Sequence, residues 1–391
     1  MKFVAFHLMP WPYLPPDFAD VADSAWVTYP NQHYDPERGR ELYERYLTEL
    51  VACEGLGFDA IAVNEHHQTA YGLMPSPNLI AMALVHRTKS TRIAILGNAI
   101  PLRDHPMRVV EEVSMLDVMS GGRIICGIVR GLGAEYHTFG LNPVYSQERF
   151  FEAHDLMVAA WTRPGPFAWE GKHYQLNYVN PWPRPIQRPH PPIWLPTQGS
   201  TSTVRWAAGQ RYTLFQTFSA LGAVTKSTRQ YVEFATELGY SPHPEQLGWA
   251  VPIYVGRDDD SAMAEFKPHV EYLYHNLRRR PWQATLPPGY VPRAAAASVA
   301  ERRRGVGTDR PSAEELAARG EIIVGGADTV LARLRKAIDT SGIGTLATMI
   351  QTGTMGHEQT TASVGRLTEL VLPKLSGYLP DPPTGTTLVT S

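Results

Sequence analysis

The pattern of hydrophobic and polar positions changes period twice between residues 91 and 140. A short, almost continuous apolar run around Ile93 is typical of a strand buried on both faces. The next segment, 105–120, places apolar residues at helical spacing and ends at Gly121, where a glycine commonly terminates a helix. A second apolar run follows over 123–129. A strand, a helix and a strand in this order predict a βαβ unit of a parallel sheet.

Apolar runs alternate with amphipathic segments over most of the chain. The eight strand candidates are Phe3–Leu8, Phe58–Asn64, the run around Ile93, Arg123–Val129, Pro191–Pro196, Tyr212–Gln216, Leu247–Gly256 and Gly344–Gln351. Helical patterns separate them, most clearly at Pro77–Arg87 and Ala327–Ser341. This order points first to an α/β fold with a single (β/α)8 TIM-type barrel, and second to an open doubly wound sheet. Because no convincing linker interrupts it, we expect one domain over 1–376 and a flexible tail over 377–391.

Three long segments break the alternation. Residues 9–36 and 162–190 are rich in aromatic residues and proline, and 278–319 is rich in proline, alanine and arginine. Such loops either wall a binding site or pack down as inert surface. We expect insertions at the C-terminal face of the strands, with 278–319 as a mobile lid over that face.

The composition describes a soluble globular protein and removes several classes of function. The 391 residues are 43% hydrophobic and 19% charged, with a formal net charge of −2 and no long basic run, which argues against nucleic acid as a partner. No stretch has the length of a membrane helix, so no membrane partner is expected. Cys53 and Cys126 lie in apolar surroundings. Buried free thiols fit a reducing compartment, which predicts a cytoplasmic protein.

Candidate chemistry follows the strand ends. Glu65, His66 and His67 come directly after the second strand, and Asn98, Arg130 and Glu135 follow the third and fourth. Because neighbouring strand residues point in opposite directions, both histidines on one metal ion would be awkward, and no metal site is predicted. A site histidine that donates, accepts or abstracts a proton is the better interpretation, with His67 packed in the structure.

A hydroxyl-rich turn, Thr197–Thr203, precedes a helix. Its backbone N–H groups, hydroxyls and helix N-terminus could bind phosphate, although an ordinary Ser/Thr N-cap explains the same residues. Arg130 is either the cationic partner of that phosphate or one half of a surface ion pair. A Rossmann fingerprint is absent, because Tyr136 stands where its third glycine should be. Asp117 lies within a predicted helix, so a structural role is expected.

Four stretches carry a family resemblance: Gly57–His67, Gly97–Arg123, Val129–Gly140 and the turn Gly199–Thr203. Together with a C-terminal GGADTV pattern, they resemble the bacterial luciferase-like flavin monooxygenases in order over nearly the whole chain. The resemblance implies a (β/α)8 barrel that binds reduced FMN at the C-terminal ends of its strands.

The resemblance also assigns cofactor-binding roles. Arg130, Ser200 and Thr203 match the residues that hold the flavin phosphate, and Gly199 stands in the same turn, where the family has an acidic residue. Asn98 and Ala99 match the bend that lies beside the isoalloxazine ring, which often contains a non-proline cis peptide.

The resemblance also concerns two positions that take part in the luciferase reaction, those of His66 and Val129. His66 matches the histidine proposed to assist in the catalytic chain of luciferase. Val129 stands where luciferase has a reactive cysteine, and Cys126 is predicted to face the opposite side of the strand. This difference argues against light emission more than against oxygen chemistry.

The resemblance implies a flavin-dependent monooxygenase, in which reduced FMN and O2 form a flavin C4a-(hydro)peroxide that oxidises an organic substrate. The aromatic segments 9–36 and 162–190 favour a mostly apolar substrate. A separate reductase is expected to supply reduced flavin, because no second nucleotide-binding module is visible, and a homodimer fits the family. Alternatives are a deazaflavin-dependent hydride transferase on the same barrel, a glycoside hydrolase barrel that uses Glu65 and Glu135, and a flavin-binding partner without catalysis. His66 argues against the last of these.

Overall fold

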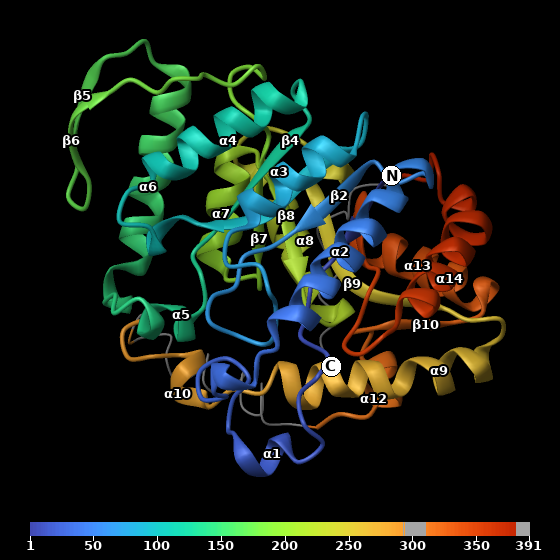
Figure 1. Cartoon of the computed structure of the whole chain (residues 1–391). Helices are drawn as coiled ribbons and strands as arrows, with labels where there is room; N and C mark the ends of the chain where they lie inside the picture. The colour runs from blue at the N-terminus through green and yellow to red at the C-terminus, as the bar shows by residue number, and fades with distance from the viewer. Residues whose placement is uncertain (292, 294–309, 381–391) are drawn as a thin grey trace.

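A closed barrel of eight parallel strands forms the centre of the molecule, in a computed structural model that describes residues 1–291, 293 and 310–380 (Figure 1). In order around the barrel the strands are β1 Lys2–Phe6, β2 Ala60–Val63, β3 Arg92–Ala99, β4 Ile124–Val129, β7 Ile193–Thr197, β8 Thr213–Thr217, β9 Leu247–Val255 and β11 Thr345–Met349. The ring closes because β9 pairs with β8 and β11, and β11 pairs with β1. The predicted (β/α)8 barrel is confirmed, and the open sheet is wrong.

The strands are apolar on both faces because one side chain in two fills the barrel and the next packs beneath a helix. Every residue of β9 is buried, for example. A further short strand, β10 (Ile323–Gly325), pairs in parallel with the end of β9 outside the ring. Its apolar run is too short to be distinguished from a loop by pattern alone.

The main surrounding helices are α2 Pro36–Ala52, α3 Pro77–Arg87, α4 Met107–Ser120, α6 Ser146–Thr162, α7 Thr201–Gln210, α8 Leu221–Glu237, α13 Ala327–Ser341 and α14 His357–Arg366. The predicted bounds of α3 and α13 are confirmed at both ends. In α4 the predicted apolar face is buried, and Gly121 ends the helix with a φ of +71°. That left-handed conformation is the one that glycine adopts without a Cβ clash.

Further helices, four of them short, gather along the lower edge of the barrel in Figure 1. They are α1 Phe18–Val21, α5 Gly133–Thr138, α9 Asp259–Tyr272, α10 Trp282–Thr285 and α12 Ala313–Ala318. The first three follow β1, β4 and β9 along the chain, so they leave from the C-terminal ends of these strands. In the described part of 278–319, α10 and α12 are helices that the sequence pattern did not predict. The rest of the expected lid, 292 and 294–309, lies outside the described residues.

The insertion 162–190 is not at the C-terminal face, which corrects the prediction. It follows α6 and precedes β7, so it leaves from the amino ends of the strands. Its two strands, β5 Phe167–Glu170 and β6 Gln175–Val179, form a hairpin. Figure 1 shows this hairpin away from α5 and α10. Asp117 of α4 binds the end of the insertion. Its carboxylate accepts hydrogen bonds from the backbone N–H groups of Ile186 at 2.7 Å and Gln187 at 3.0 Å, and from the side-chain amide of Gln187 at 2.7 Å. The expected structural role of Asp117 is confirmed.

Both cysteines are buried free thiols, as predicted. Burial raises the pKa of Cys126 to about 12, so its thiolate is scarce near neutral pH. Among the helices that the structure describes, none is long and apolar enough to cross a membrane.

Candidate functional site

Polar side chains meet where four adjacent strands end. Glu65, His66 and His67 follow β2, Asn98 ends β3, and Arg130 follows β4. The hydroxyl-rich turn follows β7, the next strand of the barrel. Because parallel strands end on one edge, the fold brings all of these groups to the same face, which is where barrels of this type carry their sites.

Glu135 of α5 holds the His66 ring. The His66 Nδ1 lies 3.1 Å from Glu135 Oε1, and the other carboxylate oxygen accepts a hydrogen bond from the Leu132 backbone N–H at 2.6 Å. Glu135 is only 2% exposed. Since a carboxylate oxygen accepts, the His66 Nδ1–H donates, and Nε2 has no hydrogen-bond partner among the described residues.

Aromatic rings enclose His66 on two sides. The Trp26 and Tyr71 ring centroids each lie 4.9 Å from that of His66, and these two rings stack on each other at 4.6 Å. The Trp26 indole N–H donates to the Leu277 carbonyl at 2.9 Å, which fixes its position. Trp26 belongs to the segment 9–36, so this segment packs against the candidate site and is not inert surface.

His67 points to a different carboxylate. Its Nε2 lies 2.6 Å from Glu65 Oε1, while Glu65 Oε2 accepts from the Ala99 backbone N–H at 3.2 Å and from Arg103 at 2.7 Å. Glu65 and Glu135 are thus already engaged with histidine, arginine and backbone groups, which disfavours the glycoside hydrolase alternative. In the described part of the chain, no group of three or more His, Cys, Asp or Glu side chains could hold a metal ion.

The turn before α7 combines a helix cap with a cluster of hydroxyls. The Ser200 hydroxyl accepts from the Thr203 backbone N–H at 3.4 Å and lies 2.6 Å from the Thr203 hydroxyl. The capping interpretation is therefore correct, and the exposed helix N-terminus remains available to an anion. Gly199 has a φ of +79°, and a Cβ at this position would lie 2.3 Å from the Ser227 hydroxyl and 3.0 Å from Gln216 Nε2. Any other residue at this position would be strained and would displace two polar groups from beneath the turn.

Arg130 contacts a segment far away in sequence. Its guanidinium lies 4.0 Å from the centre of the Tyr290 ring and donates to the Tyr290 carbonyl at 3.2 Å. The alternative of a surface ion pair is not supported, because Arg130 pairs with no carboxylate among the described residues. No direct contact joins it to Ser200 or Thr203 in the described part of the chain.

The bend at the end of β3 lies slightly earlier than expected. The non-proline cis peptide joins Leu96 to Gly97, ahead of Asn98 and Ala99, and the register of β3 against β4 shifts between Ile95 and Asn98. A Cβ on Gly97 would lie 2.7 Å from the Gly127 backbone, so only glycine fits this approach.

Three of the buried polar atoms that have no partner among the described residues lie at strand ends on the face of the candidate site. Asn64 Oδ1, Asn98 Oδ1 and Gln216 Nε2 are buried at the ends of β2, β3 and β8 and form no hydrogen bond. Such groups are rare in folded proteins and suit a cofactor with its own donors and acceptors. Sequence pattern missed Gln216, because a single glutamine inside an apolar run carries no signal until its neighbours are known.

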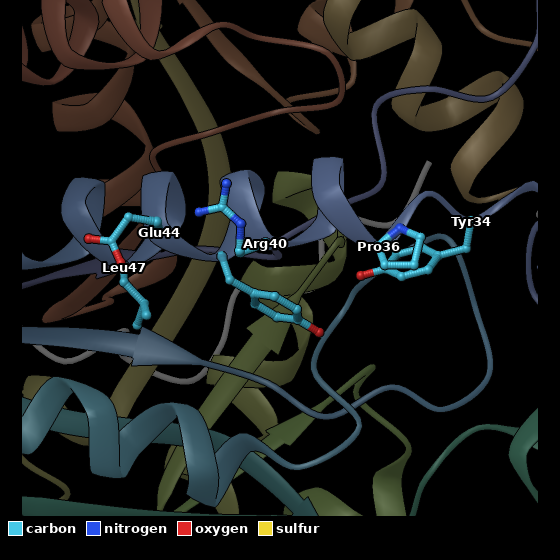
Figure 2. Close-up of a pocket in the computed structure, with 6 residues that line it drawn as sticks. Tyr34, Pro36, Arg40, Glu44 and Leu47 are labelled. Carbon is cyan, nitrogen blue, oxygen red and sulfur yellow. The ribbon is translucent and has the colours of Figure 1, made fainter.

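An open cavity of about 470 Å³ lies elsewhere, on the N-terminal half of α2 (Figure 2). Its lining residues are Tyr34, Pro36, Arg40, Tyr43, Glu44 and Leu47. None of the predicted site residues lines it, and Glu44 is occupied by a two-bond ion pair with Arg87. We therefore place the candidate active site at the strand ends and not in this cavity.

Comparisons with known proteins identify the family of the chain. The model of the luciferase-like monooxygenase family matches residues 24–343. An uncharacterized protein, y4wF, from Sinorhizobium fredii is 35% identical over 254 residues, which are 63% of this chain and 72% of that protein. The oxygenase component of a flavin-dependent trigonelline monooxygenase from Acinetobacter baylyi is 28% identical over 43% of this chain. This match spans about half the length of that relative, 47%.

Solved structures share the fold at low sequence identity. The monooxygenase RslO1 from Streptomyces bottropensis superimposes with a TM-score of 0.72 at 23% identity, covering 96% of this chain and 99% of that chain. The oxygenating constituent of 3,6-diketocamphane monooxygenase from Pseudomonas putida, solved with FMN, gives a TM-score of 0.69 at 19% identity, with coverage of 96% and 98%.

Proposed function

Because the chain belongs to the luciferase-like monooxygenase family, a family of oxidoreductases, we propose that it uses reduced FMN and O2 to oxidise an organic substrate. One observation carries this proposal. His66 is fixed by a buried carboxylate and enclosed by aromatic rings, at the same strand ends as a helix N-terminus suited to phosphate. The flavin-dependent trigonelline monooxygenase component and the FMN-bound diketocamphane enzyme support the choice of cofactor.

The residues at the strand ends fit this cofactor. Ser200, Thr203 and the free N–H groups of α7 would hold the phosphate, with Arg130 as the nearby cation. Asn98, whose Oδ1 has no partner among the described residues, and the Ala99 backbone would border the ring. When bound, reduced flavin supplies the two electrons that oxygen activation requires. His66 would hold or transfer a proton at Nε2, and the neighbouring rings would keep water away from it.

The partners follow from the same proposal. A separate reductase would supply reduced FMN, which agrees with the words "oxygenase component" in the name of the Acinetobacter relative. The aromatic surroundings of His66 favour a mostly apolar substrate. We further propose a homodimer, a cytoplasmic location and a single barrel domain over 1–376 with a tail over 377–391.

Cofactor titration tests the proposal directly. We expect reduced FMN to bind more tightly than a reduced deazaflavin, because the phosphate turn is compact. Both affinities would be measured anaerobically by fluorescence quenching. A clear preference for the deazaflavin would replace the monooxygenase with the alternative hydride transferase.

Substitution of Arg130 tests the phosphate assignment. A charge-assisted phosphate contact is worth about 1.5–3 kcal/mol, so Arg130→Ala should weaken FMN binding by roughly ten- to a hundredfold. Ser200→Ala should weaken it less, because it removes a neutral contact. Riboflavin, which lacks the phosphate, should bind all variants equally. If instead FMN affinity is unchanged and the melting temperature falls, the contact with Tyr290 is the whole role of Arg130.

A further inference from the structure

A row of aromatic rings leads from His66 to an arginine. Tyr71 lies 4.9 Å from the His66 ring and 6.2 Å from the Phe218 ring. Phe218 directly follows β8 and adopts a φ of +50°, which is rare for a bulky residue. The Arg278 guanidinium lies 4.6 Å from the centre of the Phe218 ring and 4.3 Å from that of Tyr274. We call Trp26, Tyr71 and Phe218 the ring cluster.

Arg278 is presented by an unusual piece of backbone. It comes directly after a π-helical turn, Leu273–Leu277, that continues α9. Such turns are uncommon and occur frequently at functional sites. The Leu277 carbonyl at this turn accepts the Trp26 indole N–H, which ties the turn to the ring cluster and hence to the surroundings of His66.

Arg278 has no carboxylate partner in the part of the chain that the structure describes. Burial raises the pKa of Tyr274, so this residue contacts Arg278 as a neutral ring. Glu321, whose charge acts on the Tyr274 hydroxyl, forms its own ion pair with Arg319 at 4.0 Å. The Arg278 guanidinium lies against both rings and forms no ion pair with a carboxylate among the described residues. Its planar fork of N–H donors matches the geometry of a carboxylate or a sulfonate.

We propose that Arg278 recognises an anionic group of the substrate, whose apolar body packs on Phe218, the partly exposed member of the ring cluster, on the side of Tyr71 and His66. This inference rests on the proposed function and makes the substrate class more specific: an apolar molecule that carries one carboxylate or sulfonate. The cofactor phosphate is the other anion that could occupy this position. The substrate is favoured because the turn before α7 has its own phosphate donors, whereas Arg278 is contiguous with the rings that surround His66.

Matched pairs of probes test the inference. Calorimetry would compare the members of each pair, titrated into protein saturated with reduced FMN under anaerobic conditions. One set of pairs is a linear carboxylate with the primary alcohol of equal chain length, and a further pair is phenylacetate with 2-phenylethanol. We expect at least one carboxylate to bind about tenfold or more tightly than its alcohol, as a charge-assisted contact should provide. Arg278→Gln should remove this preference and leave the affinity for the alcohol unchanged. Arg278→Lys, which keeps the charge but not the planar fork, should retain part of it.

A matched control and two counter-outcomes make the test decisive. Arg163 also lies over a ring, that of Phe167 at 5.7 Å, but beside the hairpin at the other end of the barrel, so Arg163→Gln should keep the preference. No carboxylate preference in any pair, or a preference that survives in a folded Arg278→Gln protein, would overturn the inference. Weaker binding of FMN but not of riboflavin in Arg278→Gln would assign the anion to the cofactor phosphate instead. Failure of the wild-type protein to bind FMN would refute the proposed function itself.

Discussion

His66 and His67 are adjacent in sequence but form hydrogen bonds with different carboxylates. Glu135 contacts the Nδ1 of His66, whose ring lies beside the ring cluster and whose second nitrogen has no partner in the described part of the chain. Glu65 holds His67 inside a buried network with Arg103. Both histidines lie in the loop beyond β2, which ends at Val63, so the conformation of this loop and the two carboxylates direct them to different partners.

We expect His66→Ala to bind FMN normally but to lose product formation on the order of a hundredfold or more, with hydrogen peroxide released instead. His67→Ala should keep its coupling and lose about 1–3 kcal/mol of unfolding free energy, because Glu65 loses a buried partner. Product and peroxide assays, beside urea unfolding, separate the two effects. Normal coupling in His66→Ala with uncoupling in His67→Ala would reverse the roles.

Helix α4 and the insertion 162–190 are joined at the end of the barrel that lies away from the candidate site. Asp117 is fully buried and satisfies two backbone N–H groups and one side-chain amide of the insertion. By contrast, Glu148 of α6, whose side chain is 54% exposed, contacts Lys172 and His173 of the same insertion at 2.6 and 3.1 Å. Substitution of Asp117 and of Glu148 therefore compares a buried with an exposed attachment of the insertion 162–190.

Asp117→Ala should lower the unfolding free energy by about 3 kcal/mol, because it leaves three donors without an acceptor. The hairpin should become sensitive to protease, while FMN affinity is unchanged because the site lies at the other end of the barrel. Glu148→Ala is the control and should alter neither quantity measurably. Loss of FMN binding in a folded Asp117→Ala protein would contradict this separation of the two ends.

A polar network centred on the buried Glu49 connects the first and last parts of the barrel. His7, which follows β1, is fully buried and accepts the Met9 backbone N–H at Nδ1, so its Nε2–H donates to Glu49 of α2 at 3.0 Å. Glu49 also contacts His357 of α14 at 3.0 Å. Burial lowers the pKa of His7, despite the hydrogen bond to Glu49. This network therefore requires a neutral imidazole.

The folded protein should lose stability as the pH falls below about 6.5. In that range His7 binds a proton in the unfolded chain but stays neutral in the folded protein, where its pKa is lowered. His154 and His269, whose pKa values burial also lowers, act in the same direction. His7→Gln keeps a neutral donor toward Glu49 and should reduce the acid dependence without abolishing it. Urea midpoints at about pH 7.5 and about pH 5.5 measure the slope. An unchanged slope would assign the effect to the other histidines.

The sequence by itself determined the barrel and most of its elements. Strands that are covered on both faces must be apolar throughout, and the helices that cover them must be apolar along one stripe. For this reason the hydrophobic periodicity identified all eight strands of the barrel and the bounds of α3 and α13. Pro77 at the start of α3 and Gly342 at the end of α13 fixed these boundaries locally. The structural role of Asp117 was also visible, because it lies in a helix and away from any strand end. The roles of Asn98, Ala99, Arg130, Gly199, Ser200, Thr203 and His66 remain predictions.

Only the tertiary structure decided which distant groups meet. It paired Arg130 with Tyr290, His66 with Glu135, and the ring cluster with Arg278, contacts between residues that a linear pattern treats as independent. It also placed the hairpin of 162–190 at the amino ends of the strands, because the path of a connection depends on the helix before it and the strand after it. Backbone geometry such as the Leu96–Gly97 cis peptide and the short strand β10 likewise depends on neighbouring strands. Local propensity acts over a few residues, whereas a binding site is assembled by the closure of the whole barrel.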